Sequence, residues 1–369
     1  MTTPLRIAII AEPGDPIPPW RDFNEYPQVH HLANALVALH HTVQVCAAGP
    51  SHCDARLVVT GEATAPSRPT PDRLQEHVLL SLESTRRFRA DVIHDFTGQV
   101  STLLAGFGLD VPVIHHVSGE PTTERLRVLA SASLASDPRH VLATDNPWLL
   151  DAFPDLPWRA TVRKPVAMTD CDFSVTRLPY VVYAGPLDQS SQLPDLVRTA
   201  ARMAVVLRVL SPLATKQEQA FVANCLAGLS DELREVIHFV TDADTYSQRR
   251  IISRALGLLV PAALVVRLQH PIGRALASGT PILVVGNVMT IEPALTEAVT
   301  ARTVAVDEVT MDTRALIDDI DPYECRRVAA LEYSASRAAS RWESVYRGLL
   351  AGAGTAELAQ RDRHRAWTT

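Results

Sequence analysis

The sequence has few lysines and no long hydrophobic run. Lys164 and Lys216 are its only lysines, and all other basic residues among the 35 Lys+Arg are arginines. Any mechanism that requires a lysine must therefore use one of these two. The longest apolar run, residues 255–266, contains Gly257 and Pro261 and is shorter than the roughly 18 residues that span a membrane. We therefore expect no integral membrane segment.

Cysteine motifs and metal-ligand spacings are also lacking. The 5 cysteines are scattered without Cys-x-x-Cys spacing, which argues against a disulfide framework or a zinc site and favours reduced, mostly buried thiols. The pairs His30–His31 and His40–His41 have no third ligand at a fixed spacing, so a solvated helix surface explains them better than a metal site. We expect no metal and no cofactor.

The charge balance gives no sign of a polyanionic partner. With 35 Lys+Arg against 41 Asp+Glu, the net charge of −6 offers no electrostatic reason to bind nucleic acid or a membrane surface. The composition, 47% hydrophobic and 21% charged, is that of an ordinary globular protein, and 369 residues are enough for two domains. The amino terminus does not resemble a secretory signal, so we expect a cytoplasmic protein.

Short β-branched runs alternate with longer helical patterns along the chain. This alternation predicts an α/β fold, with parallel strands joined by crossover helices. Two sets of six strands imply two similar domains, and the end of the chain, residues 323–350, is strongly helical. The expected strands are Leu5–Ala11, Val43–Ala48, Arg56–Thr60, Asp91–His94, Pro112–His116, His140–Thr144, Tyr180–Ala184, Val206–Leu210, Val236–Val240, Leu256–Val260, Pro281–Val285 and Thr303–Val306.

The alternation of strands and helices fails between Asp145 and Pro179, where several prolines interrupt the sequence. We place a linker near residues 166–178. The expected organisation is then an amino-terminal domain, a carboxyl-terminal domain, and a closing helix with a tail. Their residue ranges are 1–170, 171–325 and 326–369.

Ligands of open parallel sheets bind outside the carboxyl ends of the strands, so the residues just past each predicted strand are the site candidates. His94 and His116 have an alternative interpretation as buried histidines hydrogen-bonded to loop backbone, and both interpretations stay open. The candidates include His94, Asp95, His115, His116, Ser118, Asp145 and Asn146 in the first half, and Gly185, Lys216, Arg267, His270 and Arg274 in the second.

The segment from His270 to Pro281 gives the sharpest signal. Pro271 suits the first turn of a helix and Gly279 the residue just past its end, which predicts a short helix from about Pro271 to Ser278. His270 and Arg274 would then lie on one face at the helix amino terminus, where free N–H groups favour anions. The alternative, in which Arg274 projects into solvent, stays open.

Six segments follow one another in a recognisable order: LRIAII with the later HHLANALVALHHTVQVCAAG, ADVIHDF, VPVIHHVSGE, PYVVYAGPLD, ALASGTPILVVGN and LEYSASRAASRWESVYRGLL. Together they resemble the GT-B glycosyltransferases of the retaining family-4 type, from about Leu5 to Leu350. The resemblance implies two Rossmann-like domains facing across a cleft, with the carboxyl-terminal helix returning to the amino-terminal domain. It also implies a nucleotide-sugar donor on the carboxyl-terminal domain, a small-molecule acceptor on the amino-terminal domain, and transfer without a metal.

The sequence departs from this family at the donor motifs. The family's two glutamates fall on Val266 and Arg274, and no aspartate or glutamate occurs from Thr245 to Ile291. Its arginine and lysine fall on Pro186 and about Ser191. Each lost cation removes a few kcal/mol of transition-state stabilisation, about two to three decades of rate. Other cations must compensate if the chain transfers sugars.

Two functions remain from the sequence. The first is a glycosyltransferase that moves a sugar from a nucleotide-sugar or similar activated donor to a small-molecule acceptor. The second is a catalytically inactive glycosyltransferase-like protein that acts as a partner or binding subunit. In the first case we expect His116, Ser118 and His94 on the acceptor side, and Arg267, His270, Arg274, Lys216 and Gly185 on the donor side.

Overall fold

The computed structural model divides into two compact units, which we describe separately. Of the described residues, unit 1 comprises those up to Pro165 and those from Ala335 onward, and unit 2 comprises Val166–Ser334. The structure describes residues 3–14, 16–18, 28–64, 69–98, 109–118, 139–156, 158–211, 213–286 and 295–352.

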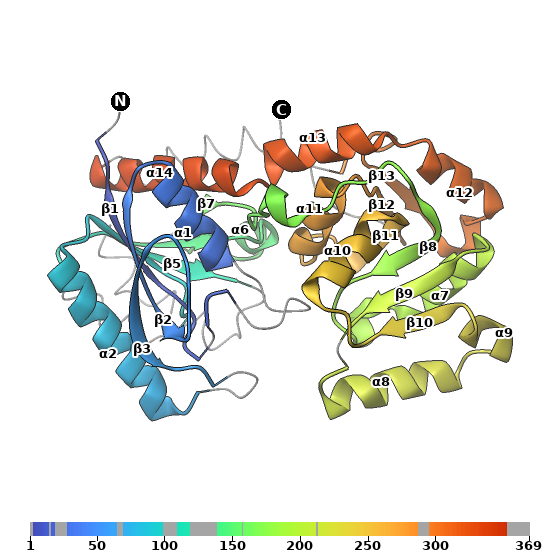
Figure 1. Ribbon diagram of the computed structural model, residues 1–369, viewed down its shortest axis with the longest axis horizontal. Coiled ribbons are helices and arrows are strands. Elements are labelled where there is room, and N and C mark those ends of the chain that lie inside the picture. Colours follow the sequence, from blue (N-terminus) through green and yellow to red (C-terminus); the bar gives the residue numbers. More distant parts are fainter. Residues whose placement is uncertain are drawn as a thin grey trace. The chain divides into compact units, whose positions relative to one another are not determined.

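Unit 1 contains a seven-stranded sheet in the order β3-β2-β1-β4-β5-β6-β7 (Figure 1). Each pair of neighbouring strands is parallel. The strand order reverses between β1 and β4, the switch point at which such sheets commonly bind ligands. The strands are β1 (Arg6–Ile10), β2 (Thr42–Gly49), β3 (Arg56–Glu62), β4 (Val92–Asp95), β5 (Val113–Val117), β6 (His140–Thr144) and β7 (Trp158–Thr161).

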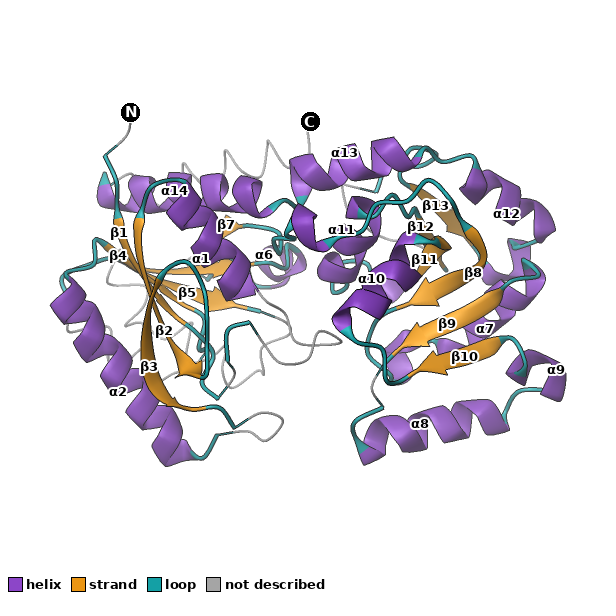
Figure 2. Cartoon of the chain, viewed as in Figure 1, coloured by secondary structure: helices purple, strands orange, loops and turns teal. Residues whose placement is uncertain are grey.

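Helices cover both faces of this sheet, because successive strand residues point to opposite faces (Figure 2). On β1, Ile7 and Ile9 join the core formed with α1 and α14. The intervening Ala8 and Ile10 join a second core formed with α2. The helices of unit 1 are α1 (Gln28–Ala38), α2 (Pro71–Phe88), α6 (Trp148–Ala152) and α14 (Ala335–Leu350).

Unit 2 contains a six-stranded parallel sheet in the order β10-β9-β8-β11-β12-β13, the same order as the first six strands of a Rossmann sheet. All seven residues of β11 are buried, as a central strand covered on both faces requires. The strands are β8 (Leu178–Tyr183), β9 (Val206–Leu210), β10 (Ile237–Val240), β11 (Ala255–Pro261), β12 (Ile282–Val285) and β13 (Ala301–Val304).

Local signals set where the helices of unit 2 begin and end. Thr215 and Glu218 form a reciprocal capping box at the start of α8, and Asp244 accepts a hydrogen bond from the Ser247 N–H at the start of α10. The helices are α7 (Leu193–Arg202), α8 (Lys216–Ala227), α9 (Asp231–Arg234), α10 (Thr245–Ser253), α11 (Gln269–Ala277), α12 (Met311–Asp318) and α13 (Pro322–Glu332). Short 3-10 turns lie at Met168–Asp170, Gln189–Ser191, Ala262–Leu264 and Val306–Glu308.

The α/β fold class and the twelve expected strands are confirmed, each strand within two residues at either end. A thirteenth, β7, was not predicted because prolines flank it on both sides. The helical end of the chain consists of two helices, α13 in unit 2 and α14 in unit 1. The expectation that the closing helix returns to the amino-terminal domain is therefore confirmed.

The expectation of a solvated helix surface is wrong for two of the paired histidines. His31 is only 7% exposed and His41 only 6%. The ring nitrogen Nδ1 of His41 accepts a hydrogen bond from the backbone N–H of Leu5 at 3.1 Å. These side chains belong to the packing of unit 1, where α1 meets β1. The cysteines agree with the expectation, since three of the five are buried and all five are free.

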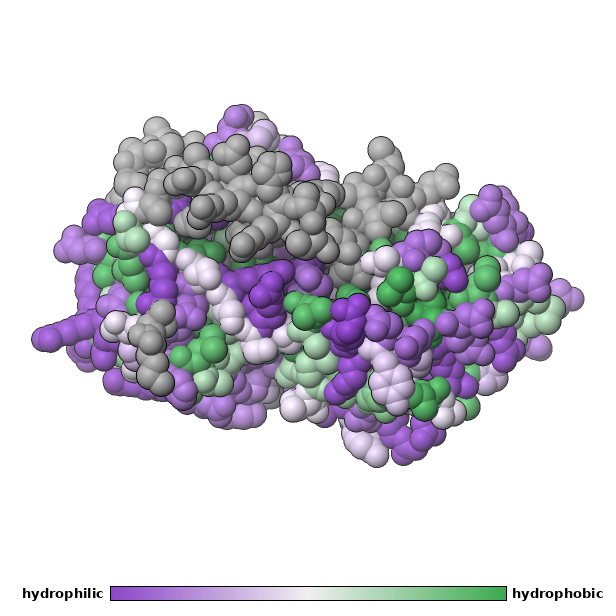
Figure 3. Space-filling model, turned by 90° about the horizontal axis from the view of Figure 1, so that it is seen from above, coloured by the Kyte–Doolittle hydropathy of each residue, from purple (hydrophilic) through white to green (hydrophobic). Residues whose placement is uncertain are grey.

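Apolar side chains on the surface are interspersed with hydrophilic ones. On the face seen in Figure 3, hydrophobic residues of unit 2 alternate with hydrophilic neighbours. Exposed hydrophobic residues of unit 2 include Met311 and Leu316 on α12 and Leu331 on α13. Within the described residues, no helix is both long enough and apolar enough to cross a membrane.

Replacing Trp342 tests the packing of α14 on the unit 1 sheet. Trp342 is 0% exposed, so Trp342→Ala leaves a large cavity and should lower the free energy of unfolding by about 3–5 kcal/mol. The matched control is Trp148→Ala on α6, where the ring is 48% exposed and the loss should be smaller. Urea titration followed by far-ultraviolet circular dichroism measures both. Equal losses for the two variants would contradict this account of α14.

Candidate functional site

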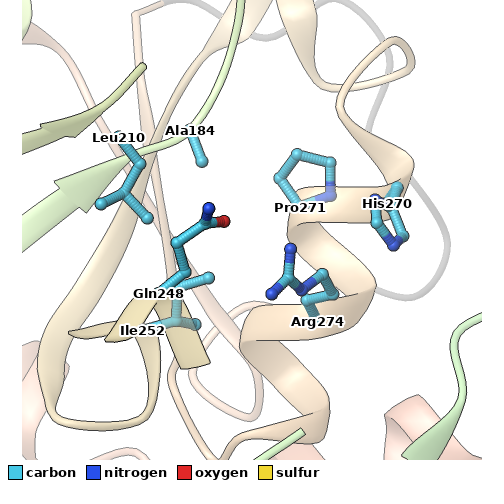
Figure 4. Close-up of a pocket in the computed structure, with 7 residues that line it drawn as sticks. All are labelled: Ala184, Leu210, Gln248, Ile252, His270, Pro271 and Arg274. Atoms are coloured by element: carbon cyan, nitrogen blue, oxygen red, sulfur yellow. The ribbon is translucent and has the colours of Figure 1, made fainter. Parts of the chain in front are cut away.

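A recess in unit 2 lies where the carboxyl ends of β8 and β9 meet α10 and the start of α11. It encloses about 310 Å³, including the open solvent at its mouth. Three apolar residues form one wall, and four further residues of α10 and α11 complete the lining (Figure 4). The wall consists of Ala184, Leu210 and Ile252, and the remaining residues are Gln248, His270, Pro271 and Arg274.

The helix α11 supplies the basic side chains of the recess, with His270 in its first turn and Arg274 in its last, so the expectation that Arg274 lies at the helix amino terminus is wrong. The helix begins at Gln269 and ends at Ala277, after which Gly279 adopts a left-handed φ of 82° that favours glycine. The prediction of a short helix in this segment is therefore confirmed. His270 and Arg274 are four residues apart, so they lie on the same face, and both line the recess. The amino end of a helix also carries a partial positive charge.

The guanidinium of Arg274 has no ion-pair partner among the described residues, and none of the seven lining residues is acidic. In Figure 4 its side chain extends toward Gln248 across the recess. Arg274 therefore does not project only into solvent, the alternative left open by the sequence. An arginine that lines a recess without an acidic residue in the lining suits an anionic ligand.

Gln248, on α10, faces Arg274 across the recess (Figure 4). Its side chain is buried, with 3% of the residue exposed. The amide nitrogen Nε2 donates a hydrogen bond to the carbonyl oxygen of Ala243 at 3.1 Å. Because the nitrogen is used in this way, the side chain presents its oxygen, Oε1, toward the α11 side of the recess (Figure 4). Sequence analysis did not identify this residue.

Three other predicted donor-side residues lie elsewhere in unit 2. Gly185 is buried beside the recess, and a side chain there would lie 2.6 Å from the Tyr183 hydroxyl, which donates a hydrogen bond to the carbonyl oxygen of Pro186. Lys216 is the exposed first residue of α8, and Arg267 is exposed just before α11. Neither cation lines the recess.

In unit 1, the carboxylate of Asp145, just past β6, lies close to side chains at the carboxyl ends of the neighbouring strands β5 and β7. Its oxygen Oδ2 accepts a hydrogen bond from Ser118 Oγ at 2.9 Å and lies 3.4 Å from His116 Nε2 and 3.5 Å from Lys164 Nζ. Asp145 and His116 are buried, whereas Ser118 is exposed at the edge. The structure thus brings together two predicted residues, His116 and Ser118, around a third candidate.

Asp145 is ionised at neutral pH despite its burial. Burial alone would raise the pKa of this carboxyl. The charge of Lys164, together with His116 and the Ser118 hydroxyl, more than offsets that effect and holds the pKa below its usual value. The carboxylate therefore serves as a fixed negative anchor for the side chains around it.

No family model and no curated protein matches this sequence. Solved structures do match over nearly its full length. AviGT4, a glycosyltransferase involved in avilamycin A biosynthesis, is 18% identical with a TM-score of 0.66, covering 95% of this chain and 99% of its own. Sucrose-phosphate synthase from Thermosynechococcus elongatus is 16% identical with a TM-score of 0.69, covering 95% and 100%. Anabaena HepE in complex with UDP and glucose is 12% identical with a TM-score of 0.67, covering 92% and 98%.

This chain has the GT-B fold. His94 lies under α14, not at the edge of the unit 1 sheet. It is 0% exposed, and its Nδ1 is 2.8 Å from the hydroxyl of Tyr346. Burial and the neighbouring His116 and His115 hold the pKa of His94 well below its usual value, so the ring is neutral. His94 is therefore a neutral side chain of the core of unit 1.

A second polar network crosses the opposite face of the same GT-B sheet. Asp95 accepts hydrogen bonds from the N–H and hydroxyl of Thr97, and its other oxygen is 2.9 Å from His115 Nδ1. The far nitrogen of His115 is 3.2 Å from His140 Nδ1. The alternative interpretation of His94 and His116, as buried histidines bonded to loop backbone, is thus correct about their burial. The hydrogen-bond partners described above for these two histidines are side chains, not backbone groups. Within the described ranges, no cluster of three potential ligands could hold a metal ion.

The pH dependence of stability tests the anchor role of Asp145. Its folded pKa lies below that of the unfolded chain, so the carboxylate stabilises the fold above about pH 4 and loses this effect as the pH falls through the folded pKa. We expect Asp145→Asn to cost about 3 kcal/mol near neutral pH and less in acid. Urea unfolding across this pH range measures the difference.

The control for this substitution is Asp195→Asn, which removes an exposed partner of Arg198 on α7. Exposed ion pairs contribute little, so its cost should stay below about 1 kcal/mol at every pH. A cost for Asp145→Asn that did not shrink in acid would contradict the assignment of a lowered pKa.

Proposed function

We propose that this chain is a glycosyltransferase that moves a sugar from a nucleotide-sugar donor to a small-molecule acceptor. The observation that carries the proposal is the unit 2 recess, which Arg274 and His270 of α11 line without an acidic residue in the lining. The GT-B fold supports the same conclusion, and so does the position of the recess at the carboxyl ends of the strands. Several fold neighbours are glycosyltransferases, and HepE was crystallised with UDP and glucose.

The cations act on the donor's diphosphate. In the transfer, an acceptor hydroxyl oxygen bonds to the anomeric carbon and gives up its proton to the departing phosphate or to solvent. The bond from that carbon to the diphosphate breaks, and its electron pair leaves with the nucleoside diphosphate. Negative charge therefore grows on a phosphate oxygen. Arg274, His270 and the α11 amino terminus stabilise this charge at fixed positions, which is where such groups contribute most.

The other predicted donor-side residues have less direct roles in this proposal. Gly185 allows the loop after β8 to pack against Tyr183, which shapes the recess beside Ala184. Arg267 and Lys216 are exposed cations of the same unit, and contact with the donor remains a prediction for both.

The acceptor is assigned to unit 1, at the edge where Asp145 anchors its neighbours. Ser118 is exposed there and offers a hydroxyl oriented by its hydrogen bond to Asp145. His116 and Lys164 flank the same carboxylate. His94 acts as a positioning residue in this proposal, because it is fully buried.

Alanine substitutions at Arg274 and His270 test the donor role. Hydrogen bonds to charged groups contribute about 1.5–3 kcal/mol, so Arg274→Ala should weaken nucleoside diphosphate binding about ten- to a hundredfold, and His270→Ala by less. Calorimetry with UDP, GDP and ADP measures this. The matched control is Arg198→Ala, because Arg198 pairs with Asp195 on α7 and does not line the recess.

Unchanged binding and turnover in both recess variants would contradict the assigned roles. If the wild-type chain bound no nucleotide or nucleotide sugar, and instead formed a stable complex with a second protein, the inactive-partner hypothesis would replace the proposal.

Chelation tests whether transfer needs a metal. Because protein cations are assigned to the diphosphate, we expect the rate of transfer to be the same with and without EDTA. The measurement is nucleoside diphosphate release from the donor that calorimetry identifies. A loss of rate with EDTA that added Mg²⁺ restored would contradict this part of the proposal.

A further inference from the structure

We propose that Gln248 determines specificity in the unit 2 recess by accepting a hydrogen bond from a ribose hydroxyl of the bound nucleotide. This inference rests on the proposed function, because it names the part of the donor that one side of the recess would bind. It concerns a residue on α10 that lies outside every segment carrying the family resemblance.

The amide of Gln248 has a fixed orientation. Its Nε2 donates to the carbonyl oxygen of Ala243, one residue before the cap of α10. That end of the helix is itself held by Asp244, which accepts from the N–H of Ser247 at 2.7 Å. Turning the amide over would place oxygen against oxygen and lose the bond, so Oε1 remains on the recess side.

The recess has donors on one side and this acceptor on the other. Arginine has only N–H donors, so Arg274 can bind only acceptors such as phosphate oxygens. Apart from the ring of His270, Gln248 is the only lining residue whose side chain can accept a hydrogen bond. A complementary ligand therefore carries an anionic group with a hydroxyl or N–H donor close to it.

The hydrogen-bond donor side and the acceptor side of the recess lie close together. Their closeness limits which part of a nucleotide can contact both. Gln248 and Arg274 line the same small recess and extend toward each other in Figure 4. With a phosphate at Arg274, the group at Gln248 must be close to that phosphate in the ligand. The ribose is bonded directly to the diphosphate, whereas the base lies one unit further away.

The transferred sugar also adjoins the diphosphate and carries hydroxyls, so it is a second candidate partner for Gln248. The burial of Gln248 favours the ribose over it. The transferred sugar must remain open to attack by a second substrate, whereas Gln248 is only 3% exposed. The apolar side chains of Leu210 and Ile252 close the wall behind it. A group enclosed there suits the nucleoside end of the donor rather than its reacting end.

Calorimetry with ribose and deoxyribose nucleotides tests the inference. The probes are UDP, GDP and ADP, and for each one that binds, its 2′-deoxy and 3′-deoxy forms. A lost hydrogen bond in a buried site costs about tenfold in affinity. We expect the wild-type chain to prefer the ribose form over one deoxy form by about tenfold, and Gln248→Leu to bind both equally. Inorganic pyrophosphate should bind the wild type and Gln248→Leu alike.

The matched control is Gln219→Leu. Gln219 lies on α8, and its Nε2 likewise donates to a backbone carbonyl, that of Leu213, but it does not line the recess. It should preserve the wild-type preference. Circular dichroism melting confirms that both variants are folded.

The outcomes separate this inference from the function on which it rests. If nucleotides bind and Arg274→Ala weakens them, but Gln248→Leu leaves the ribose preference unchanged, only the Gln248 assignment is overturned. An equal loss of ribose and deoxyribose nucleotides in Gln248→Leu would point to the base and overturn the ribose contact. Absence of all nucleotide binding in the wild type would overturn the donor assignment itself.

Discussion

A parallel sheet buried on both faces confines most polar chemistry to the carboxyl edge of its strands, and both units are built on this constraint. The seven residues of β11 are all buried and apolar, so nothing along that strand can meet a ligand. Reactive side chains instead occur just past the strands or at the starts of the following helices. The recess of unit 2 and the Asp145 cluster of unit 1 both lie at the carboxyl edge of a sheet, and the six strands of unit 2 have the same order as the first six of unit 1.

Unit 1 partly departs from this rule, because its central strands carry histidines and an aspartate within the core. Such groups are costly to bury unless they are hydrogen-bonded. The structure supplies partners on both faces: Tyr346 for His94 on one side, and Asp95 with Thr97 for His115 on the other. On the His94 side, its ring centroid lies 5.5 Å from that of His116, whose Nε2 is 3.4 Å from Asp145, the partner of Ser118. The core side chains therefore pack directly against those that hold Ser118.

Most of the fold could be predicted from the sequence, because β-branched runs and their spacing are local signals. The start of α11 could also be located, since Pro271 and Gly279 bracket that helix and place His270 and Arg274 together. Lys164 could not be placed, because it follows β7, whose flanking prolines hide the strand. Gln248 gave no signal either, because its importance depends on how α10 packs against α11, which no short segment encodes.

The scarcity of lysine limits which basic side chains can line the unit 2 recess. Only Lys216 belongs to unit 2, and it is exposed at the start of α8, so the recess depends on an arginine and a histidine. Guanidinium binds phosphate through paired, directional hydrogen bonds and remains charged at every accessible pH. In the proposed donor site, a diphosphate is therefore bound mainly through the guanidinium of Arg274, and the imidazole of His270 adds a hydrogen bond beside it.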